Sequence, residues 1–199
     1  MKSLGLSLLC CTAFVAALSA QQPPMGQGQA PQPRPLPGMI NEVKTIYTNI
    51  KTNITKAAEQ FPEEKYGWSP TPEVRTWAGL MGHLTDDNNG ACFLLAGETA
   101  APGRYDNGGK PTDLGKDMKK ADIVAKLKES FGRCDKAFDA VNDQNMAERN
   151  GTTNRSKFGA LFYNTQHINE HYGNIVTYMR LQGMVPPSSA PRGGGPAPR

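Results

Sequence analysis

Apolar residues recur at intervals of three and four positions in four stretches of the chain, and each stretch is typical of one face of an amphipathic α-helix. The four predicted helices cover residues 39–61, 71–97, 123–141 and 158–183. No segment alternates apolar and polar residues for long enough to predict a β-strand. Because helices of this kind can bury their apolar faces only against one another, we expect an all-α four-helix bundle over residues 39–183.

Residues with known positional preferences set the predicted helix ends. In the second helix, Thr71 fits the N-cap, Pro72 the first helical position and Gly97 the end. Pro62 ends the first helix and Gly183 ends the fourth. The residues expected to face the core include Met39, Val43, Ile46 and Ile50 in the first helix, and Phe158, Leu161, Phe162 and Ile168 in the fourth.

Segments rich in glycine, proline and glutamine flank and interrupt the bundle. Residues 21–38 form a predicted linker and residues 184–199 a predicted tail; both contain few apolar residues, so we expect disorder there. Residues 97–115 show no periodicity and form a loop. This loop is a candidate rim or lid over one bundle end, or equally a solvated insertion without a role.

The first twenty residues have the pattern of a secretory signal peptide. Met1 and Lys2 precede an apolar stretch over residues 4–18, and Ala20 is a small residue suited to cleavage. We therefore expect a periplasmic or secreted protein that is free of the membrane after cleavage. An uncleaved anchor is the alternative, although the apolar stretch is short for one.

Charge and cysteine content limit the function further. The 22 basic and 18 acidic residues give a formal net charge of +4, which is too small to indicate nucleic-acid binding. Beyond the leader, only Cys92 and Cys134 are present, and an oxidising compartment allows one disulfide between them. Closing that loop would stabilise the fold by about 4 kcal/mol. Two buried, reduced thiols are the alternative.

The three histidines of the chain all lie in predicted helices. His167 and His171 are four positions apart, so their imidazoles share one face of the fourth helix. His83 lies beside core positions of the second helix. Together they predict a shared metal ion with an open position for water or substrate, whereas a lone histidine is commonly just a hydrogen-bonded residue. Neutral imidazoles favour zinc or nickel, with iron, cobalt or manganese as alternatives.

Three carboxylates near these histidines are candidates for proton transfer. Asp87 follows His83 by four positions, about 40° around the helix, and could orient an imidazole or take a proton from bound water. Asp86 is an alternative, and both could simply face solvent. Cys92 is half a turn away from His83 and makes a poor ligand.

Glu170 belongs to the run HINEH, residues 167–171, which fits the HxxEH motif of inverted zinc peptidases. It is therefore a candidate general base acting on water at the metal. That peptidase family takes its third ligand from a downstream glutamate, and no acidic residue follows His171. We therefore do not expect a peptidase.

The chain resembles the DinB-like proteins over about residues 40–189. The resemblance is carried by three blocks of sequence: Tyr66–Pro70 leading into Thr76-Trp77 and Gly82–Leu84; Lys120–Val124 leading into Leu127 and Ser130-Phe131; and His167–Asn174 followed by Tyr178–Arg180 and Gly183–Ser188. It implies a four-helix bundle that holds a divalent metal through His83, His167 and His171, and that frequently dimerises.

The activity is less defined than the scaffold, because relatives include thiol-dependent S-transferases, an isomerase and many members without assigned activity. We expect an exported metal-dependent hydrolase acting on an unidentified small molecule, with Glu170 or Asp87 moving the proton. A non-catalytic metal- or ligand-binding module is the alternative, so enzymatic activity stays open. Export disfavours an S-transferase, because low-molecular-weight thiols are kept in the reducing cytosol.

Overall fold

The computed structural model describes residues 38–99, 118–151 and 153–191, which all lie in one compact unit, Leu36–Arg199. Within these residues the elements are four α-helices, two short 3-10 helices and one isolated bridge between Arg149 and Ser156, so the all-α prediction is confirmed. No helix in the described part of the chain is both long and apolar enough to cross a membrane. The predicted leader, almost all of the linker and most of the 97–115 loop fall outside the described residues.

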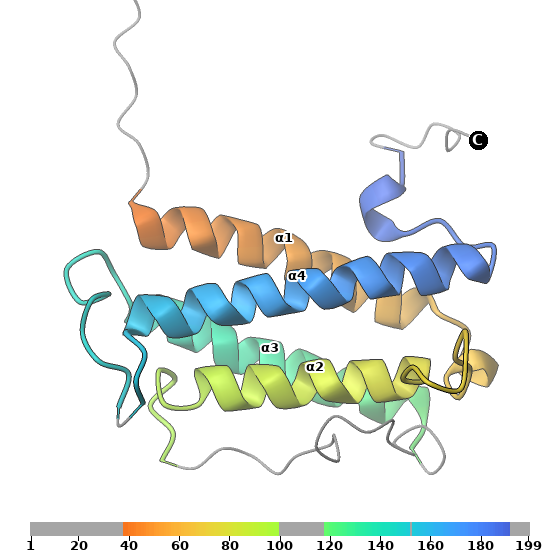
Figure 1. Cartoon of the computed structure of the whole chain (residues 1–199), viewed down its shortest axis with the longest axis horizontal. Coiled ribbons are helices and arrows are strands. Elements are labelled where there is room, and N and C mark those ends of the chain that lie inside the picture. The colour runs from red at the N-terminus through yellow and green to blue at the C-terminus, as the bar shows by residue number, and fades with distance from the viewer. Residues whose placement is uncertain (1–37, 100–117, 152, 192–199) are drawn as a thin grey trace, which may run out of the picture. The chain divides into compact units, whose positions relative to one another are not determined.

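The helices are α1 (Met39–Gln60), α2 (Trp77–Cys92), α3 (Lys120–Ala140) and α4 (Lys157–Leu181). α2 packs against α3 and α4, and α1 packs against the same two helices from the other side. α2 and α3 run in one direction, and α1 and α4 run in the other (Figure 1). The four helices therefore form a bundle in which α2 and α4 are neighbours.

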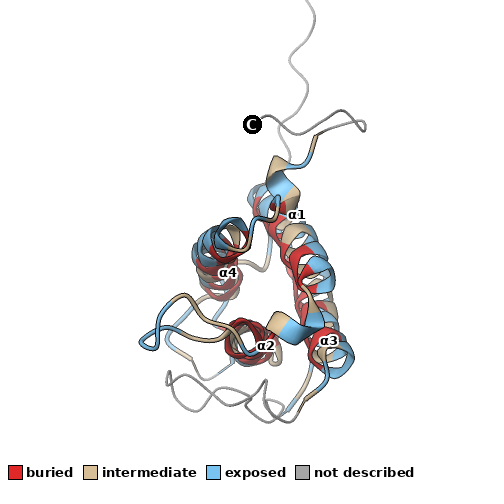
Figure 2. Ribbon diagram, turned by 90° about the vertical axis from the view of Figure 1, so that its right-hand side faces the viewer, coloured by how far each residue is buried: buried red, intermediate tan, exposed pale blue. Residues whose placement is uncertain are grey.

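The apolar faces of all four helices meet in a single core (Figure 2). Tyr47, Phe61 and Trp77 are among its largest fully buried side chains. Among the predicted core residues named above, Met39, Ile46 and Phe162 are instead exposed, at 51%, 54% and 52%. They flank the buried stripes, because each neighbouring position on a helix is rotated by about 100°.

The start of α2 differs from the prediction. The helix begins at Trp77, where the Thr76 hydroxyl accepts a hydrogen bond from the Gly79 N–H at 3.1 Å, and not at Pro72. It ends at Cys92, and the following turns reach Gly97, whose φ of 81° suits glycine. The predicted second helix over residues 71–97 was therefore too long at both ends.

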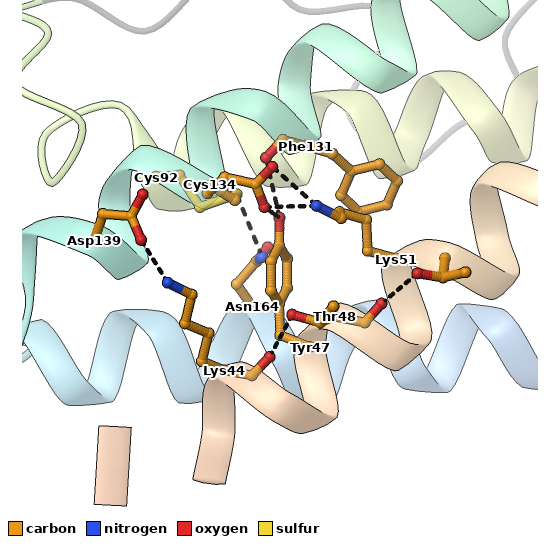
Figure 3. Close-up of polar contacts among 11 residues, drawn as sticks. Lys44, Tyr47, Thr48, Lys51, Cys92, Phe131, Cys134, Asp139 and Asn164 are labelled. Carbon is orange, nitrogen blue, oxygen red and sulfur yellow. Dashed lines mark hydrogen bonds and ion pairs between the residues drawn. A yellow bond between two sulfur atoms is a disulfide. The ribbon is translucent and has the colours of Figure 1, made fainter. Parts of the chain in front are cut away.

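Polar contacts and a disulfide tie α3 to its neighbours (Figure 3). From α1, the Tyr47 hydroxyl donates to the Phe131 carbonyl at 3.0 Å, and Lys51 donates to both oxygens of Asp135 at 2.8 and 2.9 Å. Burial, reinforced by the charge of Asp135, raises the pKa of Tyr47, so its hydroxyl keeps its proton. α1 and α3 are thus held together by buried as well as exposed polar groups.

On the α2 side of α3, the sulfur atoms of Cys92 and Cys134 lie 2.04 Å apart, which is disulfide bonding distance (Figure 3). Both residues are fully buried. The link joins the last residue of α2 to the middle of α3, so it holds together two helices that are separated by a long connection in the chain.

The predicted tail from residue 184 begins with described, packed residues. Pro187–Ser189 form the 3-10 helix η2, which contacts α1. The Tyr172 hydroxyl donates to Ser188 Oγ at 2.9 Å and accepts from the Ser188 N–H at 3.1 Å. The packed domain therefore extends past the predicted boundary at residue 183, because an aromatic hydroxyl of α4 holds the chain that follows.

Candidate metal centre

The three histidines converge where α2 and α4 face each other. His83 comes from α2, and His167 and His171 come from successive turns of α4. The three Nε2 atoms are 2.9 Å (His83–His171), 3.3 Å (His83–His167) and 3.1 Å (His167–His171) apart. The structure thus brings together side chains separated by more than eighty positions.

Asp87 adds a fourth ligand atom to this group. It lies one turn after His83 on α2, and its Oδ2 is 2.7 Å from His167 Nε2 and 3.0 Å from His83 Nε2. The four candidate ligand atoms lie within 4.8 Å of one another. We call His83, Asp87, His167 and His171 the His–Asp cluster.

The spacing within the His–Asp cluster fits a transition-metal ion. For metal–nitrogen distances of about 2.0–2.1 Å, neighbouring ligand atoms lie about 2.9 Å apart around an octahedral ion and about 3.3 Å apart around a tetrahedral one. The imidazole nitrogens of the cluster span that interval, from 2.9 to 3.3 Å. Three mutually close Nε2 atoms also cannot all be paired by hydrogen bonds to one another, since each carries either one proton or one lone pair.

The second ring nitrogens contact residues around the cluster. His171 Nδ1 lies 3.2 Å from the Asn174 side-chain amide, and His83 Nδ1 lies 3.4 Å from an Arg75 guanidinium nitrogen. Such outer contacts orient ligating imidazoles. Asn174 is three positions after His171 and could have been found from helical spacing; Arg75 precedes α2 and offered no periodic signal.

Glu170, the second predicted catalytic carboxylate, lies outside the cluster. Its Oε2 is 3.9 Å from Nδ1 of His167, the ring nitrogen that faces away from the other histidines, and its side chain is 62% exposed. Asp86 is buried on α2, next to Asp87 in the sequence, but it is not among the four converging residues. The structure therefore places Asp87, and neither of the others, beside the ring nitrogens that meet.

Burial and charge within the cluster favour a neutral His171 and an ionised Asp87. Burial, followed by the positive charges of His83 and His167, lowers the pKa of His171 to about 4. Burial alone would raise the pKa of Asp87, but hydrogen bonds and charge from His83 and His167 outweigh it, so that this pKa is lowered. A neutral His171 and an ionised Asp87 are the forms that bind a cation.

A cavity of about 470 Å³ opens beside the cluster. Asp87 and His167 line it together with Asp86, and its other walls come from α2, α4 and the loop before α4. The cavity gives a small molecule access to two members of the cluster. Cys92 takes no part in the cluster, as its angle on the helix predicts, because it faces Cys134 of α3.

Comparison with known proteins identifies the family of the chain. No curated protein matches the chain. A family model described as DinB superfamily matches residues 47–175, a span that includes all four residues of the His–Asp cluster and most of the bundle. The chain therefore belongs to the DinB superfamily.

Proposed function

We propose that this chain is an exported, divalent-metal-binding protein that hydrolyses a small molecule at the His–Asp cluster. The observation that carries the proposal is the convergence of three Nε2 atoms and the Asp87 carboxylate next to a cavity. Zinc or nickel is the expected ion, because the donors are mainly imidazole nitrogens.

The histidines and the aspartate of the cluster have different proposed roles. His83, His167 and His171 would hold the ion between α2 and α4. When bound, a divalent ion supplies Lewis-acid chemistry: it makes water more acidic and polarises an oxygen of the substrate. Asp87 lines the cavity, is held ionised, and can accept and return a proton at Oδ2.

Export is supported by the leader-like pattern of residues 1–20 and by the disulfide between Cys92 and Cys134, since disulfides persist in oxidising compartments. The same compartment argues against a thiol S-transferase, which needs a reducing supply of its cofactor.

A non-catalytic metal-binding module is the second candidate, and one feature of the cluster favours it. Four protein ligands complete the coordination of a tetrahedral ion, as in structural zinc sites. If Asp87 is a permanent ligand, water and substrate can enter only by expanding the coordination number.

Elemental analysis of the purified protein tests metal binding. We expect about one zinc or nickel ion per chain, and loss of that ion in His167→Ala. The control is Gln166→Ala, because Gln166 is the exposed neighbour of His167 on the same helix. Equal metal content in native protein and His167→Ala would reject the site.

Hydrolysis is tested separately with p-nitrophenyl acetate, p-nitrophenyl phosphate and a p-nitroanilide as probes. We expect the metal-loaded protein to hydrolyse at least one of them, and the metal-free protein and His167→Ala to hydrolyse none. A full complement of metal without any turnover would favour the non-catalytic module.

A further inference from the structure

The cavity beside the His–Asp cluster has opposite charges at its two walls. Asp86 and Asp87 line it from α2, whereas Arg155 lines it from the loop before α4. An anionic group of a bound molecule would be attracted to the guanidinium. The cavity therefore has a preferred orientation for a charged ligand.

Arg155 is connected to the cluster by a stack of rings. Its guanidinium carbon lies 4.1 Å from the centre of the Tyr163 ring, and that ring is stacked on His167, with centres 5.7 Å apart and planes 10° apart. The cation–π contact holds the guanidinium in place. No acidic residue in the described ranges forms an ion pair with Arg155, so its hydrogen-bond donors are available to a ligand.

Asn164 supplies a second recognition group in the cavity. The Ser130 hydroxyl donates its proton to the Leu127 carbonyl, so it must accept from Nδ2 of Asn88. Oδ1 of Asn88 then accepts from Nδ2 of Asn164 at 3.2 Å. This relay fixes the orientation of the Asn164 amide.

As a result, the side-chain oxygen of Asn164 is a hydrogen-bond acceptor to which no described residue donates. Asn164 is 1% exposed and lines the cavity, and its Oδ1 has no hydrogen-bond partner among the described residues. A buried carbonyl oxygen in this state costs free energy unless a ligand or a water donates to it.

We propose that the cavity binds a small carboxylate that carries an N–H or O–H donor. The carboxylate pairs with Arg155, the donor meets Asn164 Oδ1, and the remainder points toward Asp87 and His167. A carboxylate fits better than a phosphate dianion, because its one negative charge matches the one guanidinium of the cavity wall. The inference rests on the proposed function and specifies its substrate class.

Isothermal titration calorimetry of the zinc-loaded protein tests the proposal with N-acetylglycine and its neutral analogue N-acetylglycinamide. We expect the anion to bind about tenfold more tightly, as charge-assisted hydrogen bonds are worth that much. Arg155→Gln should abolish the preference, and Arg155→Lys should keep part of it. Arg180→Gln is the matched control, because Arg180 is exposed on α4 and does not line the cavity.

N-acetylsarcosine, which lacks the N–H donor, should bind more weakly than N-acetylglycine. An anion preference that survives in Arg155→Gln would mean that the carboxylate binds the zinc directly, and it would overturn the proposal. So would equal binding of the two probes to native protein, or no binding of the anion. Zinc content is measured on the same samples, so that failure to bind zinc counts against the proposed function and not against the anion site.

Discussion

At the scale of single residues, two carboxylates lie on opposite sides of the same imidazole. Asp87 Oδ2 is 2.7 Å from Nε2 of His167, and Glu170 Oε2 is 3.9 Å from Nδ1 of that ring. The first oxygen is directed at the point where the histidines converge, whereas the second belongs to a largely exposed side chain. Their contributions to metal binding should therefore differ.

Asp87→Asn should lower the affinity for zinc by about 10- to 100-fold, because the substitution removes the negative charge next to the ion and keeps the shape of the side chain. Glu170→Gln should change it by less than about threefold, as expected for an exposed pair. Competition with a chromogenic chelator measures both. Equal losses in the two variants would contradict the assignment of Asp87 to the centre.

Protonation of His171 should make the metal-free protein sensitive to acid. Its pKa is lowered from 6.5 to about 4 in the fold, so between these values the unfolded chain binds a proton that the folded chain does not. Acid therefore favours unfolding, and the free energy of unfolding should fall by about 2 kcal/mol between pH 7 and pH 5. Urea unfolding of metal-free protein at both pH values measures this. His171→Gln should show a smaller pH dependence; an identical one would assign the effect to other groups.

Much of the centre could be predicted because helical spacing carries the information. The interval of four between His167 and His171, and between His83 and Asp87, puts each pair on one helix face. Spacing does not specify which ring nitrogen of a histidine faces the centre. It therefore could not show that Asp87 lies at the centre and that Glu170 lies outside it. Arg155 lies outside the helices, where no periodicity marks it.

At the scale of elements, local rules and tertiary contacts disagree at the start of α2. Thr71 followed by Pro72 satisfies the rules for a helix start as well as Thr76 does. The helix begins after Thr76 because the first two N–H groups of α2 are bound by the segment that precedes it. Trp77 donates to the Trp68 carbonyl and Ala78 to the Tyr66 carbonyl, both at 2.9 Å. Those partners are distant enough that capping preferences alone could not reveal them.

The two threonines offer a direct comparison. Thr76→Ala should lower the free energy of unfolding by about 1 kcal/mol, since it removes the hydroxyl that accepts from the Gly79 N–H. Thr71→Ala should change it by less than about 0.5 kcal/mol, because Thr71 is exposed and precedes the helix. Chemical denaturation measures both values. A larger effect at Thr71 would show that the helix begins earlier in solution.

At the scale of the whole domain, α2 is joined to each of its two neighbouring helices by a specific link. Cys92 and Cys134 link it to α3, and the His–Asp cluster links it to α4. Four amphipathic faces were enough to predict a bundle, since they can be buried only together. They did not predict which helices would be neighbours, because an amphipathic face specifies burial but not the partner.

Since the two links use different residues and different helix pairs, their contributions to stability should be nearly independent. Replacing both cysteines, as Cys92→Ala with Cys134→Ala, should lower the free energy of unfolding by up to about 4 kcal/mol. Zinc at one hundred times its dissociation constant should raise it by about 2.7 kcal/mol.

Independence means that zinc should stabilise the variant without Cys92 and Cys134 by the same amount as the native protein, within about 0.5 kcal/mol. Urea unfolding of both proteins, with and without zinc, gives the four free energies of unfolding that this comparison needs. His167→Ala serves as the control that zinc should not stabilise. One structural route could couple the links: Nδ2 of Asn164, a residue of the cavity wall, lies 3.6 Å from Cys134 Sγ. A coupling free energy well above 0.5 kcal/mol would mean that this contact transmits the state of the cysteines to the cavity, and that the disulfide positions α4 as well as α3.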